Sequence, residues 1–262
     1  MDVRLLGLFA FFLCVACGDK FNLETERGRK ARIDEAKLHL TRGECSQARD
    51  AVAPLISDPD AAIEEEVLLI QASAFACDAG YSTLVLGANL ATITNNYGAL
   101  AKSVPNSNSE KIEALYRATD TLTQNGSKRL AANRSTNVNT LMAFIQLAVI
   151  GAILNSYGVP DTDGAQTYTL NYTGIATSGY LSHEAACALV AAHSMGIDSF
   201  DSSTLTTDSD IKDSIDTLNS SCASIPGISQ CSDLNNDRSL CGSAGTQRTQ
   251  AISMVANINS SW

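Results

Sequence analysis

Residues 33–59 read IDEAKLHLTRGECSQARDAVAPLISDP, and the spacing of their apolar side chains predicts two helices. Apolar residues recur at intervals of three and four on each side of Gly43: Ile33, Ala36 and Leu40 before it, then Ala48, Val52 and Leu55 after it. This spacing places each set on one face of a helix, and a glycine is typical of the turn that ends a helix. The stretch therefore predicts an antiparallel helix pair.

The rest of the chain is also predicted to be helical. Residues 24–94 are expected to form four helices, with turns at Gly43-Glu44, Ser57-Asp58-Pro59 and Ala79-Gly80. Later helices are predicted at residues 110–122, at residues 141–154, and from Ser182 to Met195 with Gly196 as the stop. Hydrophobic residues make up 45% of the chain and aromatic residues only 6%, which favours close-packed helices over a sandwich of strands. We therefore predict an all-α fold.

Two segments predict where the core and a boundary of the helical region lie. Leu141 to Leu154 is the most apolar internal stretch, but it holds Gln146 and is shorter than the roughly 20 residues that cross a bilayer. It is predicted to be a buried central helix, with membrane insertion as the alternative. Asn95 to Ser109 is rich in Asn and Ser, contains Pro105 and is predicted to be a polar connection at a boundary.

The first helix pair resembles one tetratricopeptide repeat. The matching pattern is Ala36-x3-Leu40-x2-Gly43-Glu44-x3-Ala48-x3-Val52-x2-Leu55-x3-Pro59, and a second unit follows with Ala72, Phe75, Ala76, Ala79-Gly80, Leu84, Gly87 and Ala88. Arg32 and His39 stand where aromatic residues are expected in that family. The resemblance implies antiparallel helix pairs in a solenoid or bundle, with a scaffold or peptide-binding surface.

The repeat geometry also implies a disulfide between Cys45 and Cys77. In stacked helix pairs the start of the second helix lies beside the end of the third, and these cysteines occupy those positions. Four more cysteines remain in the C-terminal part, where their pairing stays open: Cys187, Cys222, Cys231 and Cys241. No Cys-x2-Cys spacing occurs, so disulfides are favoured over zinc and no metal or cofactor is expected.

The N-terminus has the pattern of an export signal. Leu5 to Val15 is an uninterrupted apolar run, and Cys14-Val15-Ala16-Cys17 follows its core. This resembles the lipobox of bacterial lipoproteins, although Cys14 stands where Leu is usual. The resemblance implies that residues 1–16 are removed and that Cys17 receives the lipid. The alternative is an ordinary secretory signal cut after Ala16, and both place the chain outside the cytosol.

The net charge of the chain argues against a nucleic acid partner, and the residue after Cys17 indicates which membrane would hold the anchor. The formal net charge is −10, and the one dense basic stretch, residues 27–32, follows the predicted anchor, so a nucleic acid partner is not expected. Gly18 follows the predicted lipidated cysteine where inner-membrane lipoproteins of enteric bacteria carry Asp. The resemblance therefore implies the periplasmic side of the outer membrane.

Residues 156–181 form a long segment that we predict to be a loop or a short hairpin insertion. Tyr168, Leu170 and Tyr172 alternate, which is typical of a strand pair, and long connections in compact domains are often functional. The segment is a candidate contact surface through its acidic and aromatic side chains: Asp161, Asp163, Tyr168, Tyr172 and Tyr180. The alternative is a loop packed against the helices.

No complete catalytic motif is present in the sequence. His183, Glu184 and Cys187 share one predicted helix, but they make no His-Glu-x2-His motif. Asp233-x-Asn235-x-Asp237-x-Ser239 resembles the first half of a calcium loop, yet Arg238 replaces its glycine and Ala244 its final glutamate.

We therefore expect three regions: a signal at 1–16, an anchor with repeats at 17–95, and a disulfide-bonded helical region at 110–262 that continues the repeats. The expected function is a non-enzymatic lipoprotein that binds another envelope protein or a small ligand. The alternative is a hydrolase or metal-dependent enzyme that uses His183, Glu184 and the 156–181 loop.

Overall fold

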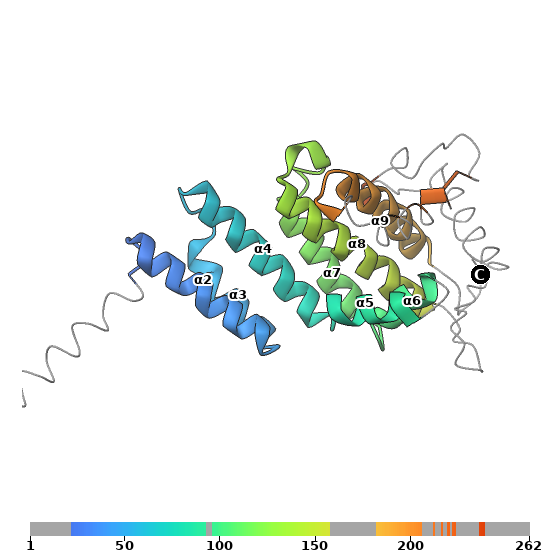
Figure 1. Ribbon diagram of the computed structural model, residues 1–262, viewed down its shortest axis with the longest axis horizontal. Helices are drawn as coiled ribbons and strands as arrows, with labels where there is room; N and C mark the ends of the chain where they lie inside the picture. Colours follow the sequence, from blue (N-terminus) through green and yellow to red (C-terminus); the bar gives the residue numbers. More distant parts are fainter. Residues whose placement is uncertain are drawn as a thin grey trace, which may run out of the picture. The chain divides into compact units, whose positions relative to one another are not determined.

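The computed structural model describes residues 22–92, 96–157, 182–205, 212, 216, 219–220, 222–223 and 236–238. Within these ranges the chain forms eight α-helices and no strand, which confirms the predicted all-α class. Figure 1 shows these helices. They divide between two compact units, residues 1–74 and 75–262, and the division falls inside one helix. The three predicted regions divide the chain elsewhere and stay a prediction.

The first unit is built on the predicted helix pair. Helix α2 (Glu26–Thr41) begins after Thr25, whose hydroxyl accepts a hydrogen bond from the amide of Gly28 at 3.1 Å. The chain then turns at Gly43, where φ is +73°, and continues as α3 (Cys45–Val52) and a 3₁₀ turn (Ala53–Leu55). Helix α4 (Ala61–Asp78) follows. The turns therefore lie where the sequence predicts them.

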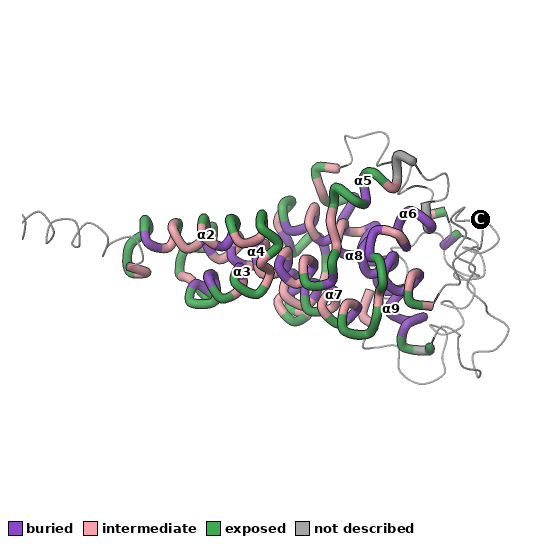
Figure 2. Tube along the Cα trace, turned by 90° about the horizontal axis from the view of Figure 1, so that it is seen from below, coloured by how far each residue is buried: buried purple, intermediate pink, exposed green. Residues whose placement is uncertain are grey.

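A one-sided core joins these helices. It consists of small and branched aliphatic side chains from α2, α3, the 3₁₀ turn and the first part of α4: Ile33, Ala36, Ala51, Val52, Leu55, Ile63, Val67 and Ile70. On α2 only Gly28, Ile33 and Ala36 are buried, so most of that helix remains in contact with solvent (Figure 2). Two ion pairs also connect parts of this unit: a largely buried one between Arg29 and Asp58 at 3.2 Å, and an exposed one between Lys37 and Glu66 at 2.5 Å.

Cys45 at the start of α3 and Cys77 near the end of α4 are joined in a disulfide, which confirms the predicted pairing. Cys187 and Cys222 are also each half of a disulfide, and both are buried. Cys231 and Cys241 lie outside the described residues.

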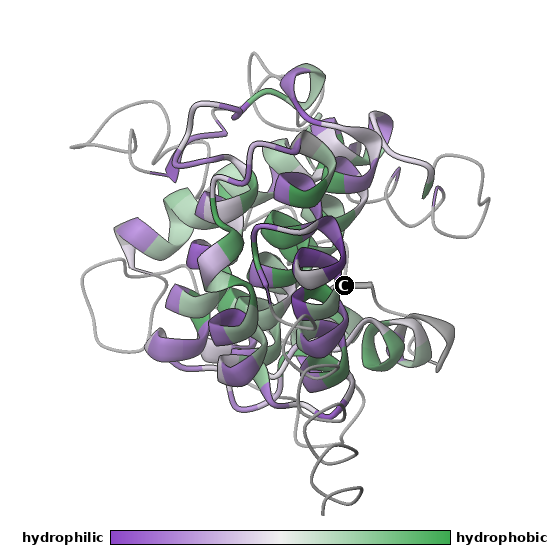
Figure 3. Cartoon of the chain, turned by 90° about the vertical axis from the view of Figure 1, so that its left-hand side faces the viewer, coloured by the Kyte–Doolittle hydropathy of each residue, from purple (hydrophilic) through white to green (hydrophobic). Residues whose placement is uncertain are grey.

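The second unit surrounds one apolar helix. Its helices are α5 (Thr83–Thr92), α6 (Asn96–Ser103), α7 (Ser109–Leu122), α8 (Thr136–Tyr157) and α9 (His183–Asp201), with a 3₁₀ turn at Ala131–Asn133 before α8. Helix α8 packs against α6, α7 and α9 (Figure 1). Residues 145–154 are all buried, whereas the outer helices show both hydrophobic and hydrophilic residues (Figure 3). The predicted central helix is confirmed.

One described helix, α8, is long and apolar enough to cross a membrane, and α4 with α5 passes the same test as a pair bent by 60°. Helix α8 is covered on several sides by neighbouring helices, which is typical of the core helix of a globular bundle. We therefore describe α8 as the core of the second unit.

Two glycines allow the helices around α8 to approach closely. A side chain at Gly151 would place its Cβ 2.2 Å from the carbonyl oxygen of Leu100 on α6. A Cβ at Gly196 on α9 would lie 3.2 Å from the Cβ of Gln146 on α8. The prediction that Gly196 ends its helix was wrong, because α9 continues to Asp201 and uses the glycine for packing.

The predicted polar connection at residues 95–109 also contains a helix. Helix α6 occupies Asn96–Ser103, and its Ala99, Leu100 and Ala101 are buried. Burial against α8 outweighs the weak local signal of this Asn-rich stretch, since tertiary packing supplies most of the stability of a short helix.

Candidate functional site

A polar pocket lies among α7, α9, the turn that follows α7, and residues 236–238. Helix α7 begins after Asn108, whose side chain accepts a hydrogen bond from the amide of Lys111 at 2.9 Å. Tyr116, Thr119 and Asp120 are three and four residues apart and so lie on one face of α7. That face presents an aromatic ring, a hydroxyl and a carboxylate together.

Arg238 contacts two of these side chains. Its guanidinium donates from Nη1 to Oδ1 of Asp120 at 3.0 Å and from Nη2 to Oδ2 at 2.9 Å. Its central carbon lies 4.3 Å from the centre of the Tyr116 ring. A bidentate pair combined with a cation–π contact fixes the plane of the guanidinium. Burial raises the pKa of Tyr116, so this ring stays a neutral phenol at physiological pH.

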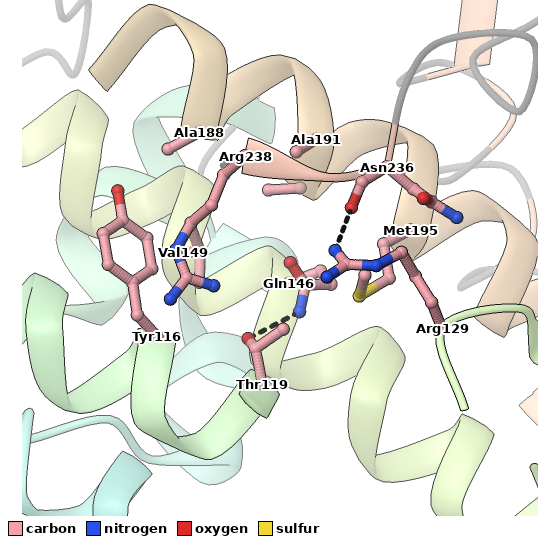
Figure 4. Close-up of a pocket in the computed structure, with 11 residues that line it drawn as sticks. Tyr116, Thr119, Arg129, Gln146, Val149, Ala188, Ala191, Met195, Asn236 and Arg238 are labelled. Atoms are coloured by element: carbon pink, nitrogen blue, oxygen red, sulfur yellow. Dashed lines mark hydrogen bonds between the residues drawn. The ribbon is translucent and has the colours of Figure 1, made fainter. Parts of the chain in front are cut away.

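Arg129 forms a second ion pair in the pocket, and Figure 4 shows its hydrogen bond to Asn236. Its Nη2 lies 3.2 Å from Oδ2 of Asp237, and its Nη1 donates to the carbonyl oxygen of Asn236 at 3.2 Å. Arg129 follows a tight turn in which Gly126 has a φ of +92°. A Cβ at Gly126 would lie 3.1 Å from Nη2 of Arg129, so the glycine leaves room for the guanidinium.

Arg134 fixes the turn that carries Arg129. It donates from Nε to Oδ1 of Asn139 at 2.8 Å and from Nη2 to Oγ of Ser199 at 2.7 Å, and Nη1 donates to the carbonyl oxygens of Lys128 and Arg129. Arg134 is 8% exposed, and burial lowers its pKa. Because each of its nitrogens is used, the guanidinium ties the Arg129 backbone to α8 and α9.

Two cavities, which we call the outer and the inner part of the pocket, share Arg129 and Arg238 in their walls. The outer part measures ≈ 370 Å³ and is lined by Asp120, Asn125, Arg129, Glu184, Asp237 and Arg238. The inner part measures ≈ 20 Å³ and is closed by Val149 and by Ala188, Ala191 and Met195 of α9 (Figure 4). The inner part has room for about one water molecule, while the outer part has the volume of a small-molecule site.

Gln146 forms the polar floor of the inner part. Its Nε2 donates to Oγ1 of Thr119 at 2.9 Å, and that hydroxyl donates to the carbonyl oxygen of Leu115 at 3.1 Å (Figure 4). Gln146 is only 3% exposed, so this chain of hydrogen bonds holds its amide in place.

His193 is the buried histidine of α9, and it does not line the described pocket. Its Nδ1 lies 2.8 Å from the carbonyl oxygen of Leu189, and burial lowers its pKa to about 4. The ring is therefore neutral near pH 7, and its contact with Leu189 fits a packing role. Among the residues that the structure describes, no group of three or more His, Cys, Asp or Glu side chains could hold a metal ion.

The structure places few of the residues that the sequence singled out. Glu184 lines the outer part of the pocket, and Cys187 is used in a disulfide. The other candidates lie outside the described residues: Cys17, Asp161, Asp163, Tyr168, Tyr172 and Tyr180, together with the side chain of His183. Of the calcium-like string only residues 236–238 are described, and its Asp237 pairs with Arg129.

No pattern in the sequence indicated the arginines at the centre of the pocket. Arg129 and Arg238 find partners 107 and 118 residues away, so no local spacing could have indicated them. The one local signal was the spacing of Tyr116, Thr119 and Asp120 on one helix face.

Comparison with known proteins identifies no relative: the chain matches no protein family, no curated protein and no solved structure.

Proposed function

We propose that the chain is an exported protein, anchored by a lipid on Cys17 at the periplasmic side of the outer membrane, whose helical part binds another molecule and catalyses no reaction. The anchor rests on the apolar run that ends in Cys14-Val15-Ala16-Cys17. The binding role rests on the polar pocket between α7, α9 and residues 236–238.

The observation that carries the binding role is the state of the charged groups in the pocket. Asp120 and Asp237 are held in ion pairs with Arg238 and Arg129, and the stacked Tyr116 is kept neutral by burial. Groups held this way offer fixed polar contacts to a ligand. A general acid or base instead needs a proton to exchange near the operating pH.

The helix pair of the first unit supports a scaffold role. Its pattern resembles a tetratricopeptide repeat, and Ala36 and Ala48, the small residues of that pattern, are both fully buried in the helix pair. We propose that α2, α3 and α4 form a divergent repeat that contacts a protein of the cell envelope.

The enzyme alternative retains one favourable observation, since Glu184 lies at the pocket. A hydrolase would need His183 to act with it. Replacing His183 with Ala in the folded protein separates the two functions, because a binding protein keeps its partner and an enzyme loses its activity.

Fractionation of cells tests the anchor. Cys17→Ser should move the protein from the membrane to the soluble periplasmic fraction and abolish labelling by a palmitate analogue. Cys14→Ser is the matched control, because this cysteine lies in the segment expected to be removed. Equal labelling of the Cys17→Ser variant and the wild type would refute the lipid anchor.

Affinity capture from solubilised membranes tests the binding role. The wild type should retain a defined partner, and Arg238→Ala should lose it because the Tyr116 and Asp120 contacts are broken. Arg117→Ala is the control, since Arg117 lies on α7 with a side chain that is 62% exposed and pairs with Glu113 outside the pocket. Capture that survives Arg238→Ala would mean that the pocket is not the contact surface. Tyr168→Ala with Tyr172→Ala tests the predicted contact segment in the same way.

A further inference from the structure

We propose that the outer part of the pocket binds the ammonium or guanidinium group of a small organic cation, with Glu184 as its counter-ion. This inference rests on one premise of the proposed function, namely that the pocket is a binding site.

The charges that line the pocket do not balance. Its described lining carries three carboxylates, those of Asp120, Glu184 and Asp237, against the two guanidiniums of Arg129 and Arg238. Asp120 pairs with Arg238 at 2.9 Å, and Asp237 pairs with Arg129 at 3.2 Å. Glu184 is left with no ion pair or hydrogen bond to any described residue. The described wall therefore carries one uncompensated negative charge.

The surroundings of Glu184 hold it at the rim of the pocket. It lies in the first turn of α9, which begins after Ser182, whose hydroxyl accepts a hydrogen bond from the amide of Ala185 at 3.1 Å. A carboxylate is favoured in the first turn of a helix, because it meets the positive end of the helix dipole there. Its side chain is exposed and free to meet a ligand.

Asn125 adds a second acceptor on the wall. It adopts a left-handed conformation with a φ of +53°, and its backbone N–H donates a hydrogen bond to the carbonyl oxygen of Asp120 at 2.8 Å. The turn therefore holds the Asn125 side chain at the pocket, where its amide oxygen can accept a hydrogen bond. An ammonium has three donors and no acceptor, so it matches a carboxylate and an amide oxygen together.

An anion fits the same wall poorly. Each arginine is already paired with a carboxylate of the protein, so an anion would have to compete with Asp120 and Asp237 for the guanidiniums. It would also meet the uncompensated charge of Glu184. A Ca²⁺ or Mg²⁺ ion takes six or more oxygen ligands, whereas the described wall has three carboxylates, of which two are already paired with guanidiniums. A monovalent organic cation needs only the one unpaired carboxylate, and its charge matches the net charge of −1 on the described wall.

The volume sets the size of the cation. A space of ≈ 370 Å³ lies at the lower end of the range for small-molecule sites. The proposed ligand is therefore an amine of about the size of an amino acid or a short side chain.

A titration with three probes of one carbon skeleton tests the inference. The full mature chain, labelled with ¹⁵N, is titrated with n-butylammonium, butan-1-ol and butyrate, and the amide resonances of Glu184 and Asn125 are followed. Only n-butylammonium should give saturable shifts. Glu184→Gln should weaken its binding about tenfold or more, because a charge-assisted hydrogen bond is lost.

Glu110→Gln is the matched control. It also removes one negative charge from an exposed position in the first turn of a helix, α7, but does not line the described pocket. Its affinity for n-butylammonium should equal that of the wild type. An equal loss in both variants would show general attraction by net charge and overturn the assignment to Glu184.

Two further outcomes would also overturn the inference: tighter binding of butyrate than of n-butylammonium, or no binding of any probe. Neither outcome decides the proposed function, because the anchor is read from fractionation and the partner from capture. Conversely, specific binding of n-butylammonium by a protein that captures no partner would sustain the cation site and refute the partner.

Discussion

The helix pair α2–α3 and the bundle around α8 are both entirely helical, but they bury their helices to very different depths. Helix α2 buries three residues on one face, whereas residues 145–154 of α8 are buried without a break. In the first region, ion pairs and the disulfide that joins α3 to α4 add to a thin core. The second adds close helix contacts at glycines and a buried polar network. The two regions should therefore respond to different substitutions.

The largest effect is expected from the disulfide that joins α3 to α4. Replacing both Cys45 and Cys77 with Ser should lower the free energy of unfolding by about 3.5 kcal/mol, because the unfolded chain regains the freedom of the closed loop. Hydrogen exchange should show lost protection first in α2 and α3, with α8 retained. Ser46→Ala, an exposed neighbour, is the control. Protection lost first in α8 would break the comparison.

Gly151 tests the close contact of the bundle. Gly151→Ala should lower the free energy of unfolding by about 3 kcal/mol, since its Cβ would collide with the backbone of Leu100 and force α6 away from α8. Gly87→Ala is the matched helical control, because no atom lies within 4 Å of its Cβ position. That variant should be stabilised by up to about 1 kcal/mol. Chemical denaturation measures both, and equal effects would contradict the packing argument.

Arg134 tests the polar network under the pocket. Arg134→Ala should cost about 2 to 3 kcal/mol of stability, because the buried acceptors of Asn139 and Ser199 and two backbone carbonyls lose their donor. It should also loosen Arg129 and weaken pocket binding. Arg117→Ala on the exposed face of α7 should change stability by at most about 0.5 kcal/mol. A silent Arg134→Ala variant would show that apolar packing alone holds the bundle.

His193 should make the bundle sensitive to acid. Its folded pKa of about 4 lies below the ordinary value of 6.5, so the unfolded state binds the proton first as the pH falls. Stability is therefore full above pH 6.5 and declines between pH 6.5 and 4, by about 2 kcal/mol from pH 7 to 5. Denaturation of wild type and His193→Gln across this range measures the slope. An equal slope in both would assign the pH dependence to other groups.

Local patterns in the sequence determined most of the helices and the burial of α8. The turn at Gly43, the start of α9 after Ser182, and the apolar run of α8 follow from interactions within a few residues, which the sequence displays directly. The repeat-like spacing also carried the pairing of Cys45 with Cys77, since the ends of neighbouring antiparallel helices meet.

Only the tertiary structure decided the existence of α6, the passage of α9 through Gly196, and the pocket. Helix α6 exists because its small apolar face is buried against α8, and Gly196 is tolerated because Gln146 occupies the space beside it. The pocket joins Asp120 with Arg238 and Arg129 with Asp237 across more than one hundred residues of chain. Such pairs leave no trace in local spacing, because their energy depends on where the packed helices bring distant side chains together.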